Sequence, residues 1–425
     1  MKQLLYFCSP LDSYSGYGAH ARDIAAALLT LEDYDVKFIL TPWGNTPNGA
    51  LQEPQWKHLA SHAVSGNLNR PDVYIQLTIP NEFQPIGVYN IGITAGIETT
   101  ICNSEWLIGC NRMNLVITTS AHSKHVFKST TYDKIDNNTK KVIETLQIVA
   151  PIEVLFEGCD TSIYKEIPKA SIEPTISEFM STIPEKFVFL CVGHWLQGGL
   201  GADRKDIGML IKTFCETFKH AAIKPALLLK TSGATTSLID RYDIMNKIYN
   251  TTRIYGDDVP SIYLLHGSLT DTEINSLYNH NKVKAFVTFT HGEGFGRPLL
   301  EFSMTGKPII APNWSGQLDF LSKNFTTLLP GQLTPVDGSA VNDWVIKDSL
   351  WYTVDYPYAA RIMQHMYTNY DVYLAKAVSQ RKYANANFTK ELMESKLRMI
   401  INSYVPKKQE IIMPKINLPK INKAV

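Results

Sequence analysis

The chain has 425 residues, of which 44% are hydrophobic and 19% charged, and its 41 Lys and Arg side chains nearly balance 40 Asp and Glu side chains. At roughly 150 residues per domain, this length predicts two or three domains. The balanced charge argues against a globally basic nucleic-acid binder, and no apolar run approaches the roughly 18 residues of a transmembrane helix. A short apolar run that stops at Pro10 predicts a first strand and no signal peptide.

The six cysteines show no CxxC spacing and mostly stand among apolar residues. Thiols in such settings are usually reduced and buried. This cysteine usage therefore predicts a cytoplasmic protein, without a disulfide framework.

The first half of the chain alternates strand and helix patterns. Apolar strands are expected at 3–8, 36–40, 73–77, 88–94 and 115–119, and helices at 19–31, 105–110 and 121–128. The β-loop-α-β order at the start predicts a parallel sheet. Residues 42–71 are irregular and are expected to form a surface excursion.

The loop at 9–18 contains Gly16-Tyr17-Gly18, which invites comparison with a dinucleotide-binding turn. Two features disfavour that interpretation. The loop is too long for the tight turn, and the second strand ends in Thr41-Pro42, without the acidic residue that would hold a ribose hydroxyl.

Prolines at 168, 174 and 184 with polar spacers mark a domain boundary. After it the pattern restarts, with strands expected at 187–192, 226–230 and 262–265 and helices at 207–218 and 271–278. A glycine-rich loop after the first of these strands carries the adjacent cations Arg204 and Lys205. The second half is thus predicted to be another α/β unit.

Residues 286–312 are the most informative stretch. A buried strand at 285–289 leads into a turn with three glycines, and a helix is expected to open near Arg297-Pro298. Strand, glycine turn and helix start together predict an anion site. The carboxylates of Glu293 and Glu301 stand in the turn and in the helix, on either side of that site.

The C-terminal part, 340–405, lacks strand patterns, and helices are expected at 358–367, 372–384 and 388–404. Residues 406–425 are predicted to be a basic flexible tail with the tandem repeat PKINL-PKINK. The alternative is an arm that touches a polyanion.

The sequence resembles the GT-B retaining glycosyltransferases of the family-4 type over nearly its whole length. Glu293-Gly294-Phe295-Gly296 through Glu301, followed by GKPIIA, is similar to the E-x7-E element of that family. Gly158 and Asp160 match its interdomain Gly-x-Asp, and SGYGAHARDIAAAL resembles its glycine-rich acceptor-side loop and first helix. The chain as a whole also resembles glycosyltransferases encoded by bacteriophages.

The resemblance implies an α/β fold of two Rossmann-like domains that face each other across a cleft. Residues 1–168 would form the acceptor-side domain, completed by about 385–405, and residues 169–384 the nucleotide-sugar-binding domain. The C-terminal helix would cross back to the N-terminal domain.

The resemblance also implies a site in which Glu293 contacts the donor sugar and Glu301 holds the donor ribose. Arg204 and Lys205 would stabilise the leaving diphosphate, although the family has an Arg soon after the strand and a Lys about five residues on, whereas here the two are adjacent after a longer loop. Neither a metal nor a cofactor beyond the nucleotide-sugar co-substrate, most simply UDP-linked, is implied. The remaining expected site residues are His194, Lys230, Gly294, Phe295, Gly296 and Arg297 on the donor side, and Ser15, Gly16, Tyr17, Gly18 and Glu98 on the acceptor side.

Two acceptors stay open: hydroxymethylated cytosine in phage DNA, in the host cytoplasm, and a glycan. The aromatic residues Tyr14, Tyr17, Trp43 and Trp56 are candidates to stack on a sugar or a base. Two other functions also stay open, a nucleotide-sugar epimerase and a non-catalytic sugar-nucleotide-binding module on the same scaffold. Oligomeric state is not predicted.

Overall fold

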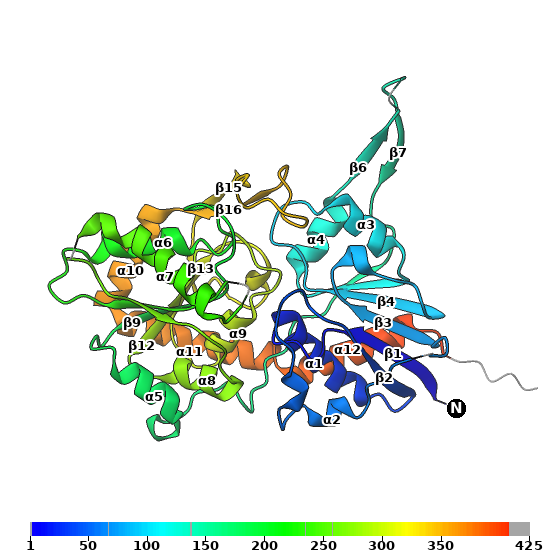
Figure 1. The fold of residues 1–425 in the computed structure, drawn as a ribbon, viewed down its shortest axis with the longest axis horizontal. Helices are drawn as coiled ribbons and strands as arrows, with labels where there is room; N and C mark the ends of the chain where they lie inside the picture. The colour runs from blue at the N-terminus through cyan, green and yellow to red at the C-terminus, as the bar shows by residue number, and fades with distance from the viewer. Residues whose placement is uncertain (1, 67, 137, 234, 257, 408–425) are drawn as a thin grey trace, which may run out of the picture.

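The chain forms two α/β domains that lie next to each other, seen in a computed structural model that describes residues 2–66, 68–136, 138–233, 235–256 and 258–407 (Figure 1). Each domain is built on a six-stranded parallel sheet. The predicted pair of Rossmann-like units is confirmed. Because 408–425 lie outside the described residues, most of the predicted basic tail does too.

The N-terminal sheet follows the order of a doubly wound fold that reverses between its first and third strands. Its strands, in sheet order, are β2 (Tyr34–Leu40), β1 (Gln3–Ser9), β3 (Val73–Leu77), β4 (Tyr89–Thr94), β5 (Leu115–Thr118) and β8 (Ile152–Val154). Its helices are α1 (Gly16–Leu29), α2 (Lys57–Ala60), α3 (Ser104–Asn111) and α4 (Ala121–Ser129). The apolar residues of β1 and β3 are buried on both sides, as parallel strands between helix layers require.

The C-terminal sheet has the 3-2-1-4-5-6 order of the Rossmann fold. Its strands, in sheet order, are β11 (Ile262–Leu265), β10 (Ala226–Lys230), β9 (Val188–Val192), β12 (Val283–Val287), β13 (Ile309–Pro312) and β14 (Thr327–Leu329). Its helices are α5 (Pro174–Ser181), α6 (Ile207–Phe218), α7 (Leu238–Thr252), α8 (Asp271–Asn279) and α9 (Arg297–Ser303). The strand order reverses between β9 and β12, and a ligand site is expected outside the carboxyl ends of these two strands.

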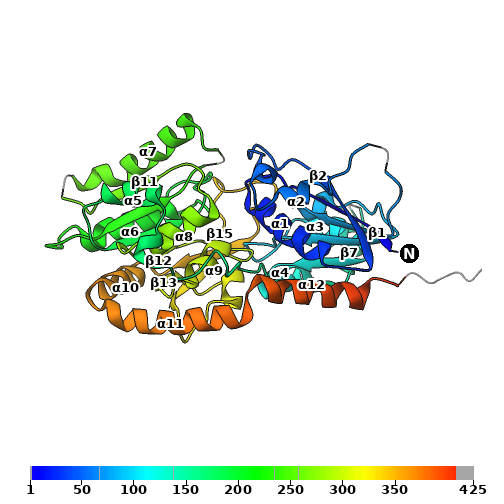
Figure 2. The same cartoon turned by 90° about the horizontal axis from the view of Figure 1, so that it is seen from below.

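Three helices close the chain and join the two domains: α10 (Tyr356–Thr368), α11 (Tyr370–Asn387) and α12 (Lys390–Tyr404). Helix α11 runs beneath the C-terminal domain, and α12 continues beneath the N-terminal domain (Figure 2). There Arg398 donates to the Thr30 hydroxyl at 3.0 Å, at the end of α1. The predicted return of the C-terminal helix is therefore confirmed.

A row of aromatic rings fills the space where the crossing occurs. Phe388 packs at 5.1 Å from Phe156 of the first half and at 6.1 Å from Phe320 of the second, and Phe320 packs at 4.9 Å from Phe295. These side chains belong to one hydrophobic cluster that spans both domains. Burial of such rings stabilises the contact between the domains.

Two hairpins stand outside the main sheets. Strands β6 (Tyr132–Ile135) and β7 (Val142–Leu146) pair only with each other among the described strands and project from the N-terminal domain (Figure 1). Strands β15 (Gly331–Pro335) and β16 (Leu350–Val354) form the second. The expectation that 340–405 contain no strand is wrong, because Leu350–Val354 pairs with residues before position 340.

Helix α1 begins three residues earlier than predicted. The Ser15 hydroxyl accepts from the N–H of Gly18 at 3.0 Å and caps the helix, so Gly16, Tyr17 and Gly18 lie in its first turn and not in a loop. Short 3-10 helices occur at Ala50–Gln52, Pro80–Glu82, Lys169–Ser171, Arg253–Tyr255 and Gly316–Asp319. None of the described helices is long and apolar enough to cross a membrane.

Candidate active site

Two loops meet at the point where the order of the C-terminal sheet reverses. One follows β9 and carries Arg204 and Lys205 to the start of α6, and the other follows β12 and carries Glu293 to the start of α9. The backbone N–H of His291 donates to the carbonyl of Arg204 at 2.9 Å and ties the loops together. Residues nearly 90 positions apart in the sequence are thereby brought side by side.

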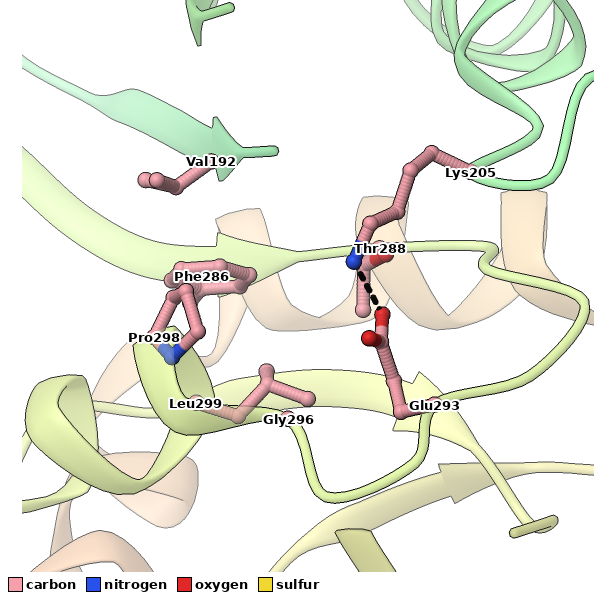
Figure 3. Close-up of a pocket in the computed structure, with 8 residues that line it drawn as sticks. All are labelled: Val192, Lys205, Phe286, Thr288, Glu293, Gly296, Pro298 and Leu299. Atoms are coloured by element: carbon pink, nitrogen blue, oxygen red, sulfur yellow. Dashed lines mark hydrogen bonds and ion pairs between the residues drawn. The ribbon is translucent and has the colours of Figure 1, made fainter. Parts of the chain in front are cut away.

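Lys205 and Glu293 form an ion pair between these loops, and their side chains point at one another (Figure 3). The Arg204 guanidinium lies 3.5 Å from the other oxygen of Glu293 and 3.6 Å from Glu98, which belongs to the N-terminal domain. Burial by itself would raise the pKa of Glu293, but Lys205 and Arg204 outweigh it and hold this pKa below its ordinary value. Glu293 is therefore an ionised carboxylate that pairs with two cations.

Beside this pair lies a small space between the carboxyl ends of β9 and β12. It measures about 10 Å³, enough for roughly one water molecule. Its lining residues are Val192, Lys205, Phe286, Thr288, Glu293, Gly296, Pro298 and Leu299.

Two buried aspartates flank the cations and shape their loop. The Asp203 carboxylate accepts from the N–H of Ile207 at 3.3 Å, at the start of α6. Asp206 takes the left-handed conformation (φ 51°) and accepts from the Tyr356 hydroxyl at 2.7 Å. These contacts fix the backbone on both sides of Arg204-Lys205, and the sequence did not indicate them.

The glycine turn presses against the N-terminal domain. A Cβ atom on Gly292 would lie 2.0 Å from the carbonyl oxygen of Glu98, and one on Gly294 would lie 2.2 Å from that of Ala95. Backbone therefore meets backbone at this interface, and only glycine fits. Gly296 ends the turn at φ 98° and caps α9, and Phe295 is buried.

A serine that the sequence did not single out supports Glu293 from below. The Ser315 hydroxyl accepts from the N–H of Glu293 at 2.9 Å and donates to Gln317. The N–H of Gly316 donates to the carbonyl of Glu293 at 2.9 Å. The segment NWSGQ after β13 has the composition of a turn, and it was the one sequence feature that could have indicated this support of Glu293.

Glu301 lies one turn inside α9 and contacts Arg297. The Nε of Arg297 donates to Glu301 at 2.8 Å, and its Nη1 donates to Asp23 of α1 at 2.6 Å. Burial raises the pKa of Glu301 to about 7, although Arg297 opposes this shift. Glu157, also buried, has its pKa raised to about 7 by burial, again against Arg297.

His194 and Lys230 flank the cations but do not contact Glu293. Lys230 donates to the carbonyl of Gly267 at 2.8 Å, and His194 lies 3.2 Å from the Ser232 hydroxyl. The pKa of His194 is lowered, first by burial and then by its cationic neighbours Lys205, Arg204 and Lys230. His194 and Lys230 thus lie with the two cations at the carboxyl end of the second sheet.

The residues predicted for the acceptor side border the same interface through Tyr17. Its hydroxyl lies 3.2 Å from both the Thr94 hydroxyl and the N–H of Ala95, the residue that faces Gly294. The ring of Tyr17 stacks on Trp43 at 3.9 Å. Ser15 and Gly18 set the start of α1, while Gly16 is exposed there.

Within the described parts of the chain, no group of three or more His, Cys, Asp or Glu side chains is placed to hold a metal ion. The charged groups of the site are instead two cations against the carboxylates of Glu98 and Glu293. Such a set is suited to binding an anion by charge-assisted hydrogen bonds.

Comparison with solved structures agrees with this architecture. HepE from Anabaena in complex with UDP and glucose has a TM-score of 0.62 and 14% identity, covering 94% of this chain and 100% of its own. A glycosyltransferase from Rickettsia africae has a TM-score of 0.61 and 14% identity, covering 96% and 100%. Sucrose-phosphate synthase from Thermosynechococcus elongatus has a TM-score of 0.60 and 11% identity, covering 95% and 99%.

No protein-family model and no curated protein matches the sequence. The structural likeness, at these identities, defines the fold. The chain has the GT-B fold of glycosyltransferases, with two Rossmann-like domains, as the sequence resemblance implied.

Proposed function

We propose that this chain is a retaining glycosyltransferase that moves a sugar from a UDP-linked donor to an acceptor hydroxyl, without a metal ion. The observation that carries the proposal is the convergence of Arg204, Lys205 and Glu293 at the switch point of the second sheet, facing Glu98 of the first domain. Solved structures of similar fold include one described with UDP and glucose. We further propose that residues 1–168 with about 385–405 form the acceptor domain, and 169–384 the donor domain.

The cations serve the leaving group in this proposal. When the bond between the sugar C1 and the diphosphate oxygen breaks, negative charge grows on the diphosphate, and Arg204 and Lys205 stabilise it. His194, Lys230 and the backbone from Gly294 to Arg297 complete the donor side. The acceptor oxygen attaches to C1 on the same face, and its proton goes to a diphosphate oxygen, so atoms and charge balance without a protein nucleophile.

Donor binding also changes the partners of Glu293. In the free site this carboxylate pairs with both cations, and the space beside it is about 10 Å³. A diphosphate that binds Arg204 and Lys205 therefore takes the place of Glu293. The released carboxylate then accepts from hydroxyls of the donor sugar, while Glu301 holds the ribose.

The charge of the acceptor domain favours a glycan over DNA. Residues 1–168 and 385–405 together contain 19 Asp and Glu against 15 Lys and Arg, a net charge of −4. DNA binding depends on neutralising phosphates with cations, so this balance repels a duplex. Hydroxymethylated cytosine in phage DNA is the second candidate, and the basic tail that would favour it lies outside the described residues, except for 406–407.

A mass-spectrometric screen of nucleotide sugars against simple glycans and hydroxymethylated DNA tests the proposal. A product heavier by one sugar, with the anomeric configuration of the donor, is expected. An isomeric nucleotide sugar formed without acceptor would indicate an epimerase, and donor binding with neither transfer nor hydrolysis would indicate a non-catalytic module. A cytoplasmic location, that of the host if the gene is of phage origin, belongs to the proposal and is supported by six free, buried cysteines.

A further inference from the structure

A chain of buried charges crosses the boundary between the two domains. Arg297, the first residue of α9, donates to Glu301 of its own helix at 2.8 Å and to Asp23 of α1 at 2.6 Å. Lys390 of α12 lies 4.0 Å from Asp23 and 3.7 Å from Asp160. Helices α1 and α9 lie next to each other where the domains meet (Figures 1 and 2).

The central members of this chain are well shielded from water. The side chains of Asp23 and Glu301 are 5% and 9% exposed, and that of Arg297 is 18% exposed. Removing one partner of a buried ion pair leaves the other charge unpaired in a medium of low dielectric constant, which is costly. The Arg297–Asp23 contact therefore links the domains through two charges, either of which is costly to leave unpaired while the domains stay in contact.

Two further buried groups surround Arg297. Glu157 adds a third carboxylate that interacts with it. His20, one turn before Asp23 on α1, is 2% exposed, and neither of its ring nitrogens has a hydrogen-bond partner among the described residues. Burial and the nearby Arg297 lower the pKa of His20 to about 3, so this ring is neutral and does not compete for Asp23.

The geometry makes Arg297 a link between two events. Its Nε holds one oxygen of Glu301, and its Nη1 is held by Asp23 of the N-terminal domain. The orientation of the Glu301 carboxylate therefore depends on whether Asp23 contacts Arg297. A ligand that binds to Glu301 senses this contact through that orientation. Ligand binding at Glu301 and the contact between Arg297 and Asp23 are then linked: each favours the other to the same extent.

We propose that Arg297 is a positioning residue that couples donor binding at Glu301 to contact between the two domains, through its ion pair with Asp23. The inference rests on the proposed function for the identity of the donor. A purely structural ion pair would lower stability without linking the two events.

The test uses the full chain with Asp23→Asn, Arg297→Gln and their double variant. Asp258→Asn is the matched control, because it removes the same charge from an exposed pair with Lys224 on the C-terminal domain. UDP affinity is measured by calorimetry, and the separation of the domains by the radius of gyration from small-angle scattering. Thermal unfolding confirms that each variant is folded, and Arg297→Lys, which keeps the charge, serves if Arg297→Gln does not fold.

We expect Asp23→Asn to lower the affinity for UDP about tenfold and to raise the radius of gyration of the free protein. The donor KM rises while kcat changes less, Arg297→Lys keeps part of the affinity, and Asp258→Asn behaves as wild type. The double variant is expected to bind UDP no more weakly than Arg297→Gln, because both single substitutions break the same ion pair.

An unchanged UDP affinity in Asp23→Asn, or additive losses in the double variant, would overturn the coupling. If the wild-type protein binds no UDP, the proposed donor is wrong. The scattering comparison of wild type with Asp23→Asn still decides whether this ion pair holds the domains together.

Discussion

The guanidinium of Arg204 lies 3.5 Å from the carboxylate of Glu293, and the same carboxylate also receives the ammonium of Lys205. Two adjacent cations thus share one anion at the end of a parallel sheet. The proposed function assigns the donor diphosphate to both cations, because both lie against the same carboxylate.

Replacing either cation is expected to impair transfer more than binding. Lys205→Ala or Arg204→Ala removes a charge that faces the leaving group, and the loss of such a group costs about 10²–10³ in kcat. Steady-state kinetics with saturating donor measure the effect. Lys219→Ala, which removes an exposed cation paired with Glu216, is the control and should keep the wild-type rate. Wild-type kcat in both site variants would rule out this role.

The glycine turn offers a steric test of the interface. Gly294→Ala would place a methyl group 2.2 Å from the carbonyl oxygen of Ala95, so the facing loops must move apart. We expect transfer to fall about tenfold or more in an enzyme that remains folded. Gly338→Ala, whose Cβ meets nothing within 4 Å, is the matched control. Equal activity of the two variants would contradict the proposed closeness of the domains during transfer.

Donor binding should depend on pH through Glu301. Its pKa is raised to about 7, so the ionised fraction of the carboxylate proposed to accept from ribose hydroxyls grows between pH 6 and pH 8. The donor KM is expected to fall over this interval, and Glu301→Gln should flatten the profile. Glu157 titrates in the same range and helps to raise the pKa of Glu301, so Glu157→Gln should move the profile to lower pH without flattening it. A slope that vanishes in Glu157→Gln instead would assign the effect to that residue.

Stability should also depend on pH through Glu157. Its folded-state pKa is about 7 against an ordinary value of 4.5, so the folded state binds more protons than the unfolded state between these values. The free energy of unfolding therefore falls as pH rises from about 4.5 to 7. Glu157→Gln removes this penalty and should stabilise the protein by about 1–3 kcal/mol at pH 8, with a smaller gain near pH 5. Urea unfolding at the two pH values measures the difference, and an equal gain at both would contradict it.

Elements with a regular pattern of buried apolar residues were predictable from local sequence. The strands Ala226–Lys230 and Ile262–Leu265 and the helix Ile207–Phe218 match their predicted bounds. Helix α7 was not predicted. Its apolar residues Leu238, Ile239 and Tyr242 are exposed, and the only buried residues among its described ones are Ile244 and Ile248. A helix with apolar residues on two faces lacks the single stripe that indicates amphipathicity.

The sequence by itself determined the α/β class, the two repeated units and the glycine turn with Glu293 and Glu301, because these depend on short-range periodicity and spacing. The tertiary structure alone decided that Lys205 meets Glu293 and that Arg297 meets Asp23, which stands 274 residues earlier in the chain. Such contacts arise from sheet order and from the packing of one domain against the other. No local pattern encodes the distance between residues that only the fold brings together.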